Sequence, residues 1–240
     1  QVMMTAGGAA GLAAAGIAGI VLWRDGIGQS YATGIGEIRT VALSDGSIIT
    51  LNTASKVSVR YSPKMRKIDL VQGEALFSVA KNKTRPFVVS AGNAVVRAVG
   101  TSFTVRHLSE DPVKILVQEG VVEVRRRNAP EAAPVRAKAD TQTIVPHKDS
   151  ISTRTIPYSQ VARNLAWQYG QIAFDNTTLA EAASEFARYS NERIVVEPDV
   201  ASRTVTGLFA SNDPVGFAKA VARALDLHLE VENKEVRIVR

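Results

Sequence analysis

The first 23 residues of the chain contain no Asp, Glu, Lys or Arg, and from Val2 to Trp23 only Thr5 is clearly polar. All 29 Lys+Arg and 23 Asp+Glu therefore lie in residues 24–240, which carry the whole formal net charge of +6. Because a helix rises about 1.5 Å per residue, this segment would extend for about 33 Å, enough to cross the hydrocarbon core of a bilayer. We expect residues 1–23 to form a single transmembrane helix.

Two other interpretations of this segment are weaker. A cleaved signal peptide needs a basic start and a small-residue cleavage site, whereas no basic residue precedes this run and it ends in Ile-Val-Leu-Trp. A buried core helix would be unusually long. Trp23 followed by Arg24 is typical of a membrane interface, and the scarcity of basic residues before Arg39 favours an exported body. We interpret the opening Gln1 as a sign that earlier residues have been removed.

The composition of residues 24–240 narrows the chemistry. The chain has no cysteine, which excludes thiolate metal sites, cysteine nucleophiles and disulfides. A pI near 9.7 is compatible with nucleic-acid binding. However, the basic residues are scattered, the one dense run is Arg125-Arg126-Arg127 after an expected strand, and aromatic residues are few. We do not expect direct contact with nucleic acid.

Residues 24–157 have the pattern of an all-β domain. Short alternating segments from Gly36 to Val124 are separated by turn sequences such as Ser44-Asp45-Gly46-Ser47 and Glu119-Gly120. This pattern predicts a β-sandwich or an irregular β-solenoid, with no helix in that stretch. Prolines at 130, 134, 146 and 157 then interrupt the chain, and we place a domain boundary near residue 158.

From Tyr158 to Arg240 the hydrophobic period changes to that of an α+β module. Strands are expected at 171–174, 193–197, 205–209, 227–231 and 235–239. Two amphipathic helices are expected between them, one after Thr178 and one over 215–225 with Asp213 as its cap. Two βαβ rounds of similar length predict helices packed on one face of a small sheet.

Nothing in the sequence assembles a conventional active site. His107, His147 and His228 are isolated from one another, so we expect no metal, and no dinucleotide or phosphate-binding motif is present. We expect no cofactor and no enzymatic activity toward an external substrate. One pair, Gly100-Thr101, could support an N-to-O acyl shift, in which the Thr hydroxyl attacks the preceding carbonyl. The plainer interpretation is a tight turn at Gly100 followed by an ordinary strand residue.

The order of several blocks resembles one family. The blocks start with Gly36-Glu37-Ile-Arg39 and Leu51-Asn52-Thr-Ala-Ser55. They continue with Val-Gln-Gly73-Glu74-Ala-Leu-Phe77, Arg85-Pro86-Phe87, Val99-Gly100-Thr101-Ser-Phe103 and Val117-Gln-Glu119-Gly120. Across residues 36–124 this order resembles the FecR family of membrane-bound sigma-factor regulators, or anti-sigma factors. The part from Trp167 to Phe209 is similar to the short secretin/TonB-type domain that ends these proteins.

The resemblance implies an inner-membrane protein whose residues 24–240 are periplasmic. Such a regulator relays a signal from a TonB-dependent outer-membrane receptor, often one concerned with iron transport, to an extracytoplasmic-function sigma factor that affects transcription. Its partners would be the receptor's signalling domain, the sigma factor through a cytoplasmic segment missing here, the inner membrane, and periplasmic and intramembrane proteases. The resemblance also implies possible self-cleavage at Gly100-Thr101, as in some family members.

We expect the receptor to dock on the C-terminal module by strand addition or on an apolar patch. The candidate contact residues are Val205, Leu208, Phe209, Val236, Ile238 and Val239, although some of these would instead be core residues. The alternative function is a membrane-tethered module that binds envelope polysaccharide. That alternative would require Trp167 and several tyrosines to form an exposed aromatic surface.

Overall fold

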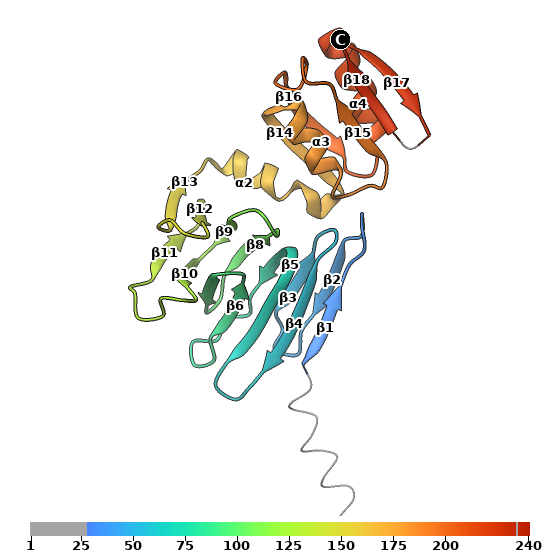
Figure 1. Ribbon diagram of the computed structural model, residues 1–240. Helices are drawn as coiled ribbons and strands as arrows, with labels where there is room; N and C mark the ends of the chain where they lie inside the picture. Colours follow the sequence, from blue (N-terminus) through green and yellow to red (C-terminus); the bar gives the residue numbers. More distant parts are fainter. Residues whose placement is uncertain (1–27, 234) are drawn as a thin grey trace, which may run out of the picture.

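The structure of the protein, a computed structural model, describes residues 28–233 and 235–240. Figure 1 shows a β domain (residues 28–157) with a C-terminal module (residues 158–240) stacked on it. The β domain contains the strands β1 (Gln29–Ala32), β2 (Arg39–Ala42), β3 (Ile48–Leu51), β4 (Lys56–Tyr61), β5 (Arg66–Ser78), β6 (Phe87–Ala91), β7 (Ala94–Ala98), β8 (Ser102–His107), β9 (Val113–Glu119), β10 (Val121–Arg126), β11 (Val135–Lys138), β12 (Thr141–Val145) and β13 (Ser152–Thr155).

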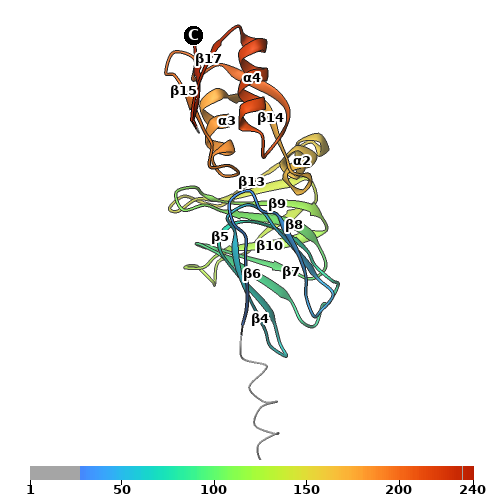
Figure 2. The ribbon, with the colours of Figure 1, turned by 90° about the vertical axis from the view of Figure 1, so that its right-hand side faces the viewer.

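These strands form two layers that share β5. The first sheet has the order β1-β4-β5-β6-β7-β10-β11, and the second has the order β2-β3-β5-β8-β9-β12-β13. All pairings are antiparallel except β5 with β6. Figure 2 shows the two layers stacked, with the C-terminal module on the side of the second sheet. The predicted all-β fold is therefore a sandwich.

Strand β5 passes from one sheet to the other at Gly73. Residues before it pair with β4 and β6, and residues from Gly73 onward pair with β3 and β8. Gly73 has a φ of +91°, and a Cβ there would lie 2.2 Å from the Ser55 hydroxyl oxygen. Because other residues rarely adopt this conformation and no space exists for a side chain, the corner requires glycine.

The core of the β domain lies between the two sheets and follows the period of two along each strand. Phe77 is packed against Phe87 and Phe103, with ring centroids 5.9 Å and 5.4 Å away. One phenylalanine comes from the first sheet and two come from the second, so the rings join the layers. All three are fully buried.

The C-terminal module combines three α-helices and a short 3₁₀ helix with two small sheets. Its elements are α2 (Tyr158–Asn164), the 3₁₀ helix η1 (Ala166–Tyr169), β14 (Gln171–Thr178), α3 (Leu179–Phe186), β15 (Arg193–Val196), β16 (Thr204–Ala210), α4 (Pro214–Leu225), β17 (His228–Glu232) and β18 (Glu235–Val239). Thr178 caps α3 in a capping box with Glu181, and Asp213 caps α4 by accepting from Gly216 N at 2.7 Å. Both predicted helix starts are confirmed.

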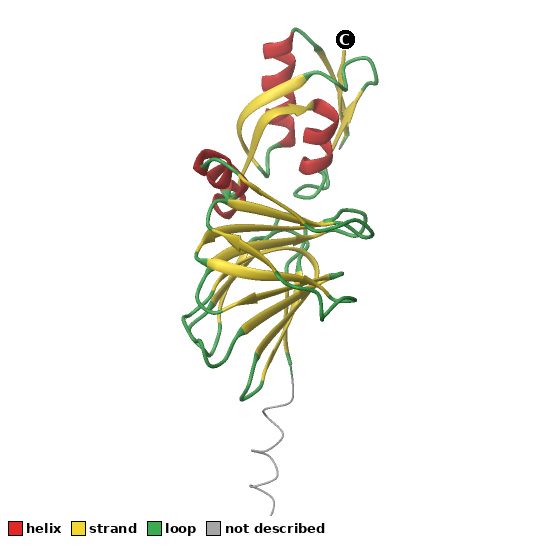
Figure 3. Cartoon of the chain, turned by 90° about the vertical axis from the view of Figure 1, so that its left-hand side faces the viewer, coloured by secondary structure: helices red, strands yellow, loops and turns green. Residues whose placement is uncertain are grey.

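The arrangement of this module corrects one expectation. Instead of helices on one face of a single sheet, β14 pairs antiparallel with β16, and a separate sheet has the order β15-β18-β17. Helices α3 and α4 each contact strands of both sheets, and Figure 3 shows them between the strands. Phe174, Phe186 and Phe217 fill this middle layer, with centroids 4.6–6.0 Å apart. Helices with apolar residues on two sides can cover two sheets at once.

The predicted transmembrane helix, residues 1–23, lies outside the described residues. Within residues 28–233 and 235–240, none of the helices has the length and apolar character needed to cross a bilayer. The mainly β class is confirmed by the strands above. The helix α2 (Tyr158–Asn164) and the following η1 (Ala166–Tyr169) were not predicted, because each is only one or two turns long and too short to show a clear helical period.

Candidate functional site

Four charged side chains fasten the C-terminal module to the second sheet. Arg106 on β8 donates to both carboxylate oxygens of Glu185 on α3, over 3.1 Å from Nη1 and 2.8 Å from Nη2. Arg188, just after α3, pairs with Glu185 and also lies 3.4 Å from Glu74 of β5. Arg106 lies 3.8 Å from the same Glu74 oxygen. We call Glu74, Arg106, Glu185 and Arg188 the junction cluster.

Neutral hydrogen bonds extend this cluster across the same junction. The Asn52 amide donates to Glu74 Oε2 at 3.0 Å and to Tyr189 Oη at 2.8 Å. Thr53 Oγ1 donates to the Arg188 carbonyl oxygen at 2.6 Å. Asn52 and Thr53 lie at the turn after β3, whereas their partners in the module, Arg188 and Tyr189, follow α3. The module is therefore held by backbone as well as by side chains.

The electrostatics of the cluster follow from burial and pairing. Burial alone would raise the pKa of Glu185, but the charges of Arg106 and Arg188 outweigh it and hold that pKa below its usual value. Burial similarly opposes charging of Arg106, yet Glu185 and Glu74 raise its pKa. The pKa of Tyr189 is raised mainly by burial, so its hydroxyl stays protonated. Glu185 and Arg106 are therefore both ionised at neutral pH.

Apolar packing continues across the junction. Leu76 of β5 and Leu116 of β9 point out of the second sheet and belong to the same core as Trp167, Phe174 and Phe186 of the module. Ile156, between β13 and α2, belongs to this core as well. The β domain and the module thus share a hydrophobic core in addition to the polar contacts.

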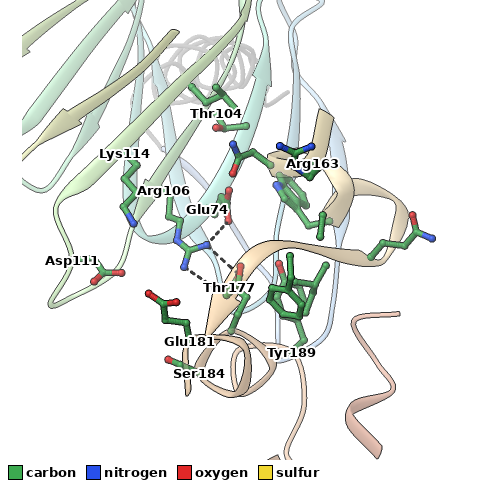
Figure 4. Close-up of a pocket in the computed structure, with 18 of the residues that line it drawn as sticks. Glu74, Thr104, Arg106, Asp111, Lys114, Arg163, Thr177, Glu181, Ser184 and Tyr189 are labelled. Atoms are coloured by element: carbon green, nitrogen blue, oxygen red, sulfur yellow. Dashed lines mark hydrogen bonds and ion pairs between the residues drawn. The ribbon is translucent and has the colours of Figure 1, made fainter. Parts of the chain in front are cut away.

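A pocket of about 480 Å³ opens between the two parts, beside the junction cluster. Figure 4 shows Glu74, Arg106, Lys114 and Tyr189 among its lining side chains. Trp167 also lines it and is 95% buried, and its Nε1 finds no acceptor within the described part of the chain. Nowhere in the described residues do three His, Cys, Asp or Glu side chains gather closely enough to hold a metal ion. The charged and polar side chains that line the pocket suit a polar ligand.

The predicted partner-contact residues do not form one surface. Val205, Leu208 and Phe209 lie on β16, whereas Val236, Ile238 and Val239 lie on β18, in the other sheet. Val236 and Ile238 are 2% and 0% exposed, because they lie on the face of β18 that packs against the helices and belong to the core of the module. These two are core residues, which corrects the expectation for them.

Among the predicted partner-contact residues, those on β16 remain accessible to a partner. Leu208 is 55% exposed, and its neighbours Val205 and Phe209 are half-buried against the core of the module. β14 has β16 along one edge and contacts α2 and η1, whereas β16 pairs only with β14 among the described strands. The other edge of β16 therefore has unpaired backbone groups, as strand addition requires.

The Gly100-Thr101 pair lies in the turn between β7 and β8. Gly100 has a φ of +150°, and a Cβ there would lie 2.4 Å from Lys81 Cγ. Thr101 is buried, and its hydroxyl has no hydrogen-bond partner within the described residues. The Thr101 carbonyl oxygen accepts from Val79 N at 2.9 Å. The geometry explains the glycine, while self-cleavage remains a prediction.

The junction was missed by sequence reasoning. Glu74 appeared in the sequence only as part of a family-like block, whereas in the structure its carboxylate reaches Asn52, Arg188 and Arg106. The partners are 114 residues apart in sequence for Glu74 and Arg188, so no local spacing links them. The one available signal was that Glu74 is flanked by apolar residues on a buried strand.

The described chain is thus a β-sandwich joined through a shared core to a small α+β module with an open strand edge. Residues 29–123 match the family described as FecR protein. No curated protein sequence matches the chain.

Two crystal structures of a candidate anti-sigma factor from Parabacteroides distasonis ATCC 8503 are similar to this chain, each with a TM-score of 0.73. The 2.50 Å structure is 23% identical in sequence, and the match covers 89% of this chain and 99% of the other. The 1.65 Å structure is 24% identical, with 88% and 99% covered. The likeness extends through the C-terminal module and establishes the shared fold.

Proposed function

We propose that this chain is a sigma-factor regulator that works by binding partners. The observation that carries the proposal is the FecR match over residues 29–123. It is supported by the fold shared with a candidate anti-sigma factor over nearly the whole of that chain. The charged and apolar residues at the junction are all used in holding the two parts together, which suits a relay better than a catalyst.

In this proposal the signal enters at the C-terminal module. The signalling domain of a TonB-dependent outer-membrane receptor adds a strand along the open edge of β16, with Leu208 in the contact. Val205 and Phe209 support that strand from beneath. The junction cluster then carries the docked state to the β domain, because it is the polar connection between the α3 region and the second sheet.

The remaining parts of the proposal concern topology. Residues 1–23 anchor the chain in the inner membrane, and residues 24–240 lie in the periplasm. Regulated proteolysis releases the signal to an extracytoplasmic-function sigma factor, and the sigma-binding contacts fall on none of the described residues. The support for the anchor is the absence of charge from residues 1–23.

The test is a calorimetric titration of the full chain, in detergent, with the receptor's signalling domain. Leu208→Asp should weaken binding at least tenfold, because it places a charge in an apolar contact. Val231→Asp is the matched control, since Val231 is a similarly exposed valine on β17 of the other sheet. The reverse pattern would move docking to β17, and the absence of binding would remove the receptor relay.

We also propose that self-cleavage at Gly100-Thr101 contributes to this function. Thr101 Oγ would attack the Gly100 carbonyl carbon, the Gly100–Thr101 C–N bond would break as the nitrogen takes a proton, and water would hydrolyse the resulting ester. The unpartnered hydroxyl supports the proposal. Intact mass should show two fragments that Thr101→Ala abolishes. A single unbroken mass in both proteins would refute it.

The polysaccharide-binding alternative is not supported by the aromatic residues. It requires Trp167 on an exposed surface, but that side chain is buried at the junction. Tyr158 and Tyr169 are well exposed, yet they stand at the two ends of the α2–η1 segment, and the Trp of that segment, Trp167, is buried. Regulation of a sigma factor is therefore the function that the described residues support better.

A further inference from the structure

The outer face of the first sheet has a strong excess of positive charge. Along its described strands, seven basic side chains point away from the core and are opposed by two carboxylates, Asp69 and Glu123. We call the following residues the basic face: Lys56, Arg60, Lys67, Arg97, Arg125, Arg136 and Lys138. This face holds most of the chain's net charge on one side of one sheet.

Most of this charge is available to a partner. Asp69 pairs with Arg60 and Lys67, and Glu123 lies 3.3 Å from Arg97 and 3.4 Å from Arg136. Each carboxylate thus serves two cations. Lys56, Arg125 and Lys138 make no ion pair within the described part of the chain, and their charges remain uncompensated.

The basic face also has apolar surface and a shallow hollow. Val71 and Val121 are about half exposed among the cations. A depression of about 370 Å³ has Val88 and Val95 in its lining, together with five charged side chains and a proline: Arg97, Glu123, Arg125, Arg126, Arg127 and Pro130. Arginine side chains beside exposed valines suit a phospholipid, because the arginines can bind its phosphate group and the valines can contact its acyl chains.

The position of the face indicates which anionic partner it meets. Figure 2 shows the C-terminal module on the opposite side, over the second sheet. The described chain begins at this face, because Gly28 packs against the Arg60 side chain and β1 pairs with β4. Only five residues, 24–28, separate Trp23 from β1, and five extended residues span at most about 17 Å. If residues 1–23 are in a bilayer, the face is close to its surface.

We propose that the basic face binds the anionic phospholipid headgroups of the membrane that holds residues 1–23. This goes beyond the proposed relay and rests on it only for the anchor. Juxtamembrane cations are attracted to anionic lipid over about one Debye length, roughly 8–10 Å. The short connection of residues 24–28 allows the basic face to come within this distance of the bilayer surface. The outward residues of the described first sheet include no aromatic ring for stacking on bases, since Tyr31 and Tyr61 pack against the core. A bilayer therefore fits better than nucleic acid.

The consequence is an orientation for the whole protein. With the first sheet on the bilayer, the second sheet and the C-terminal module face away from the membrane. The open edge of β16 would then be presented toward a partner that approaches from outside, and it would not turn toward the lipid.

The test uses the full chain in lipid nanodiscs, either of phosphatidylcholine alone or with added phosphatidylglycerol. Because the chain has no cysteine, a polarity-sensitive fluorophore can be attached uniquely at Val71→Cys on the face or at Ser202→Cys on the module. We expect a blue-shifted emission from position 71 in the anionic discs, lost at high salt. Position 202 should stay solvent-like in both.

Neutralising the three unpaired cations, with Lys56→Gln, Arg125→Gln and Lys138→Gln together, should lower the equilibrium constant for face contact by about fivefold per charge, on the order of a hundredfold in all. The matched control neutralises three exposed cations of the module: Arg203, Lys219 and Arg223. It changes the net charge equally and should leave the emission of position 71 shifted.

Three results would overturn the proposal: no shift at position 71 in anionic discs, a shift that the face variant leaves intact, or a shift caused by a DNA duplex but not by lipid. Retention of the chain in the discs is scored separately. Retention without a shift would refute the basic face alone, whereas loss of retention would refute the membrane anchor as well.

Discussion

Replacing Arg106 by Met should destabilise the junction much more than the same change at an exposed pair. Arg106 makes two charge-assisted hydrogen bonds to Glu185, and its side chain is 24% exposed. Such bonds contribute about 1.5–3 kcal/mol each when buried. Arg188 still pairs with Glu185 and Glu74 in the variant, and partial exposure screens the loss. We therefore expect a loss of about 2 kcal/mol in the free energy of unfolding.

The assay is urea unfolding of the full chain followed by circular dichroism and by tryptophan fluorescence, to which Trp23 and Trp167 both contribute. A protein of this size has a slope of about 2–3 kcal/mol per molar urea, so the midpoint should fall by about 0.8 M. The melting temperature should fall by about 4–8 °C. Arg60→Met is the matched control, because Arg60 forms an exposed cross-strand pair with Asp69 and its loss should cost at most about 1 kcal/mol.

A double-mutant cycle with Glu185→Gln isolates the pair. We expect the two changes to be non-additive, with a coupling energy of about 1–2 kcal/mol, because each residue loses its partner in the other's variant. The reasoning is refuted if Arg106→Met and Arg60→Met have the same midpoint, or if the coupling energy is zero. Either result would mean that the Arg106–Glu185 pair does not help to hold the module on the sheet.

Three further predictions concern acid, the β5 corner and a helix cap. The pKa values of Glu185 and Asp45 are held below their unfolded values, so both carboxylates stabilise the fold above about pH 4. This stabilisation is lost as the pH falls through their folded pKa values. When Arg106→Met is titrated with acid, its free energy of unfolding should therefore fall by less than that of the native chain. Gly73→Ala should cost about 3 kcal/mol or more by chemical denaturation, since its φ and the contact with Ser55 both oppose a side chain, whereas Gly170→Ala, at a positive φ with open space, should cost about 1 kcal/mol. Thr178→Ala should cost about 1 kcal/mol and Thr178→Asp much less, measured in the same way, and equal losses would argue against the cap.

The strands and helices with strong periods were accessible from the sequence. Alternation in β4 and the spacing of Leu179, Ala182 and Phe186 in α3 depend on neighbours in the chain, and so do the Thr178 and Asp213 caps. The division of strands between two sheets was not accessible in the same way. It depends on Gly73, whose role is evident only when Ser55 is seen beside it.

The candidate site was less predictable for a related reason. Val236 and Ile238 could belong to either a partner surface or a core by residue type, and only their packing against the helices shows that they are core residues. The junction cluster joins Glu74 to residues more than a hundred positions away. Single charged residues in a basic chain give no indication of such pairing.

The shared strand β5 has a mechanical consequence. Its second half carries Glu74 and Leu76, which contact the C-terminal module, and its first half lies beside β4, the strand that pairs with β1. Any tension applied to the module against the start of the chain would therefore be transmitted along β5 as shear on its hydrogen-bond ladders. Those bonds would share the force in parallel, and the weakest point would be at the polar contacts between α3 and β8. A pulled molecule should yield there first, with its sandwich still folded.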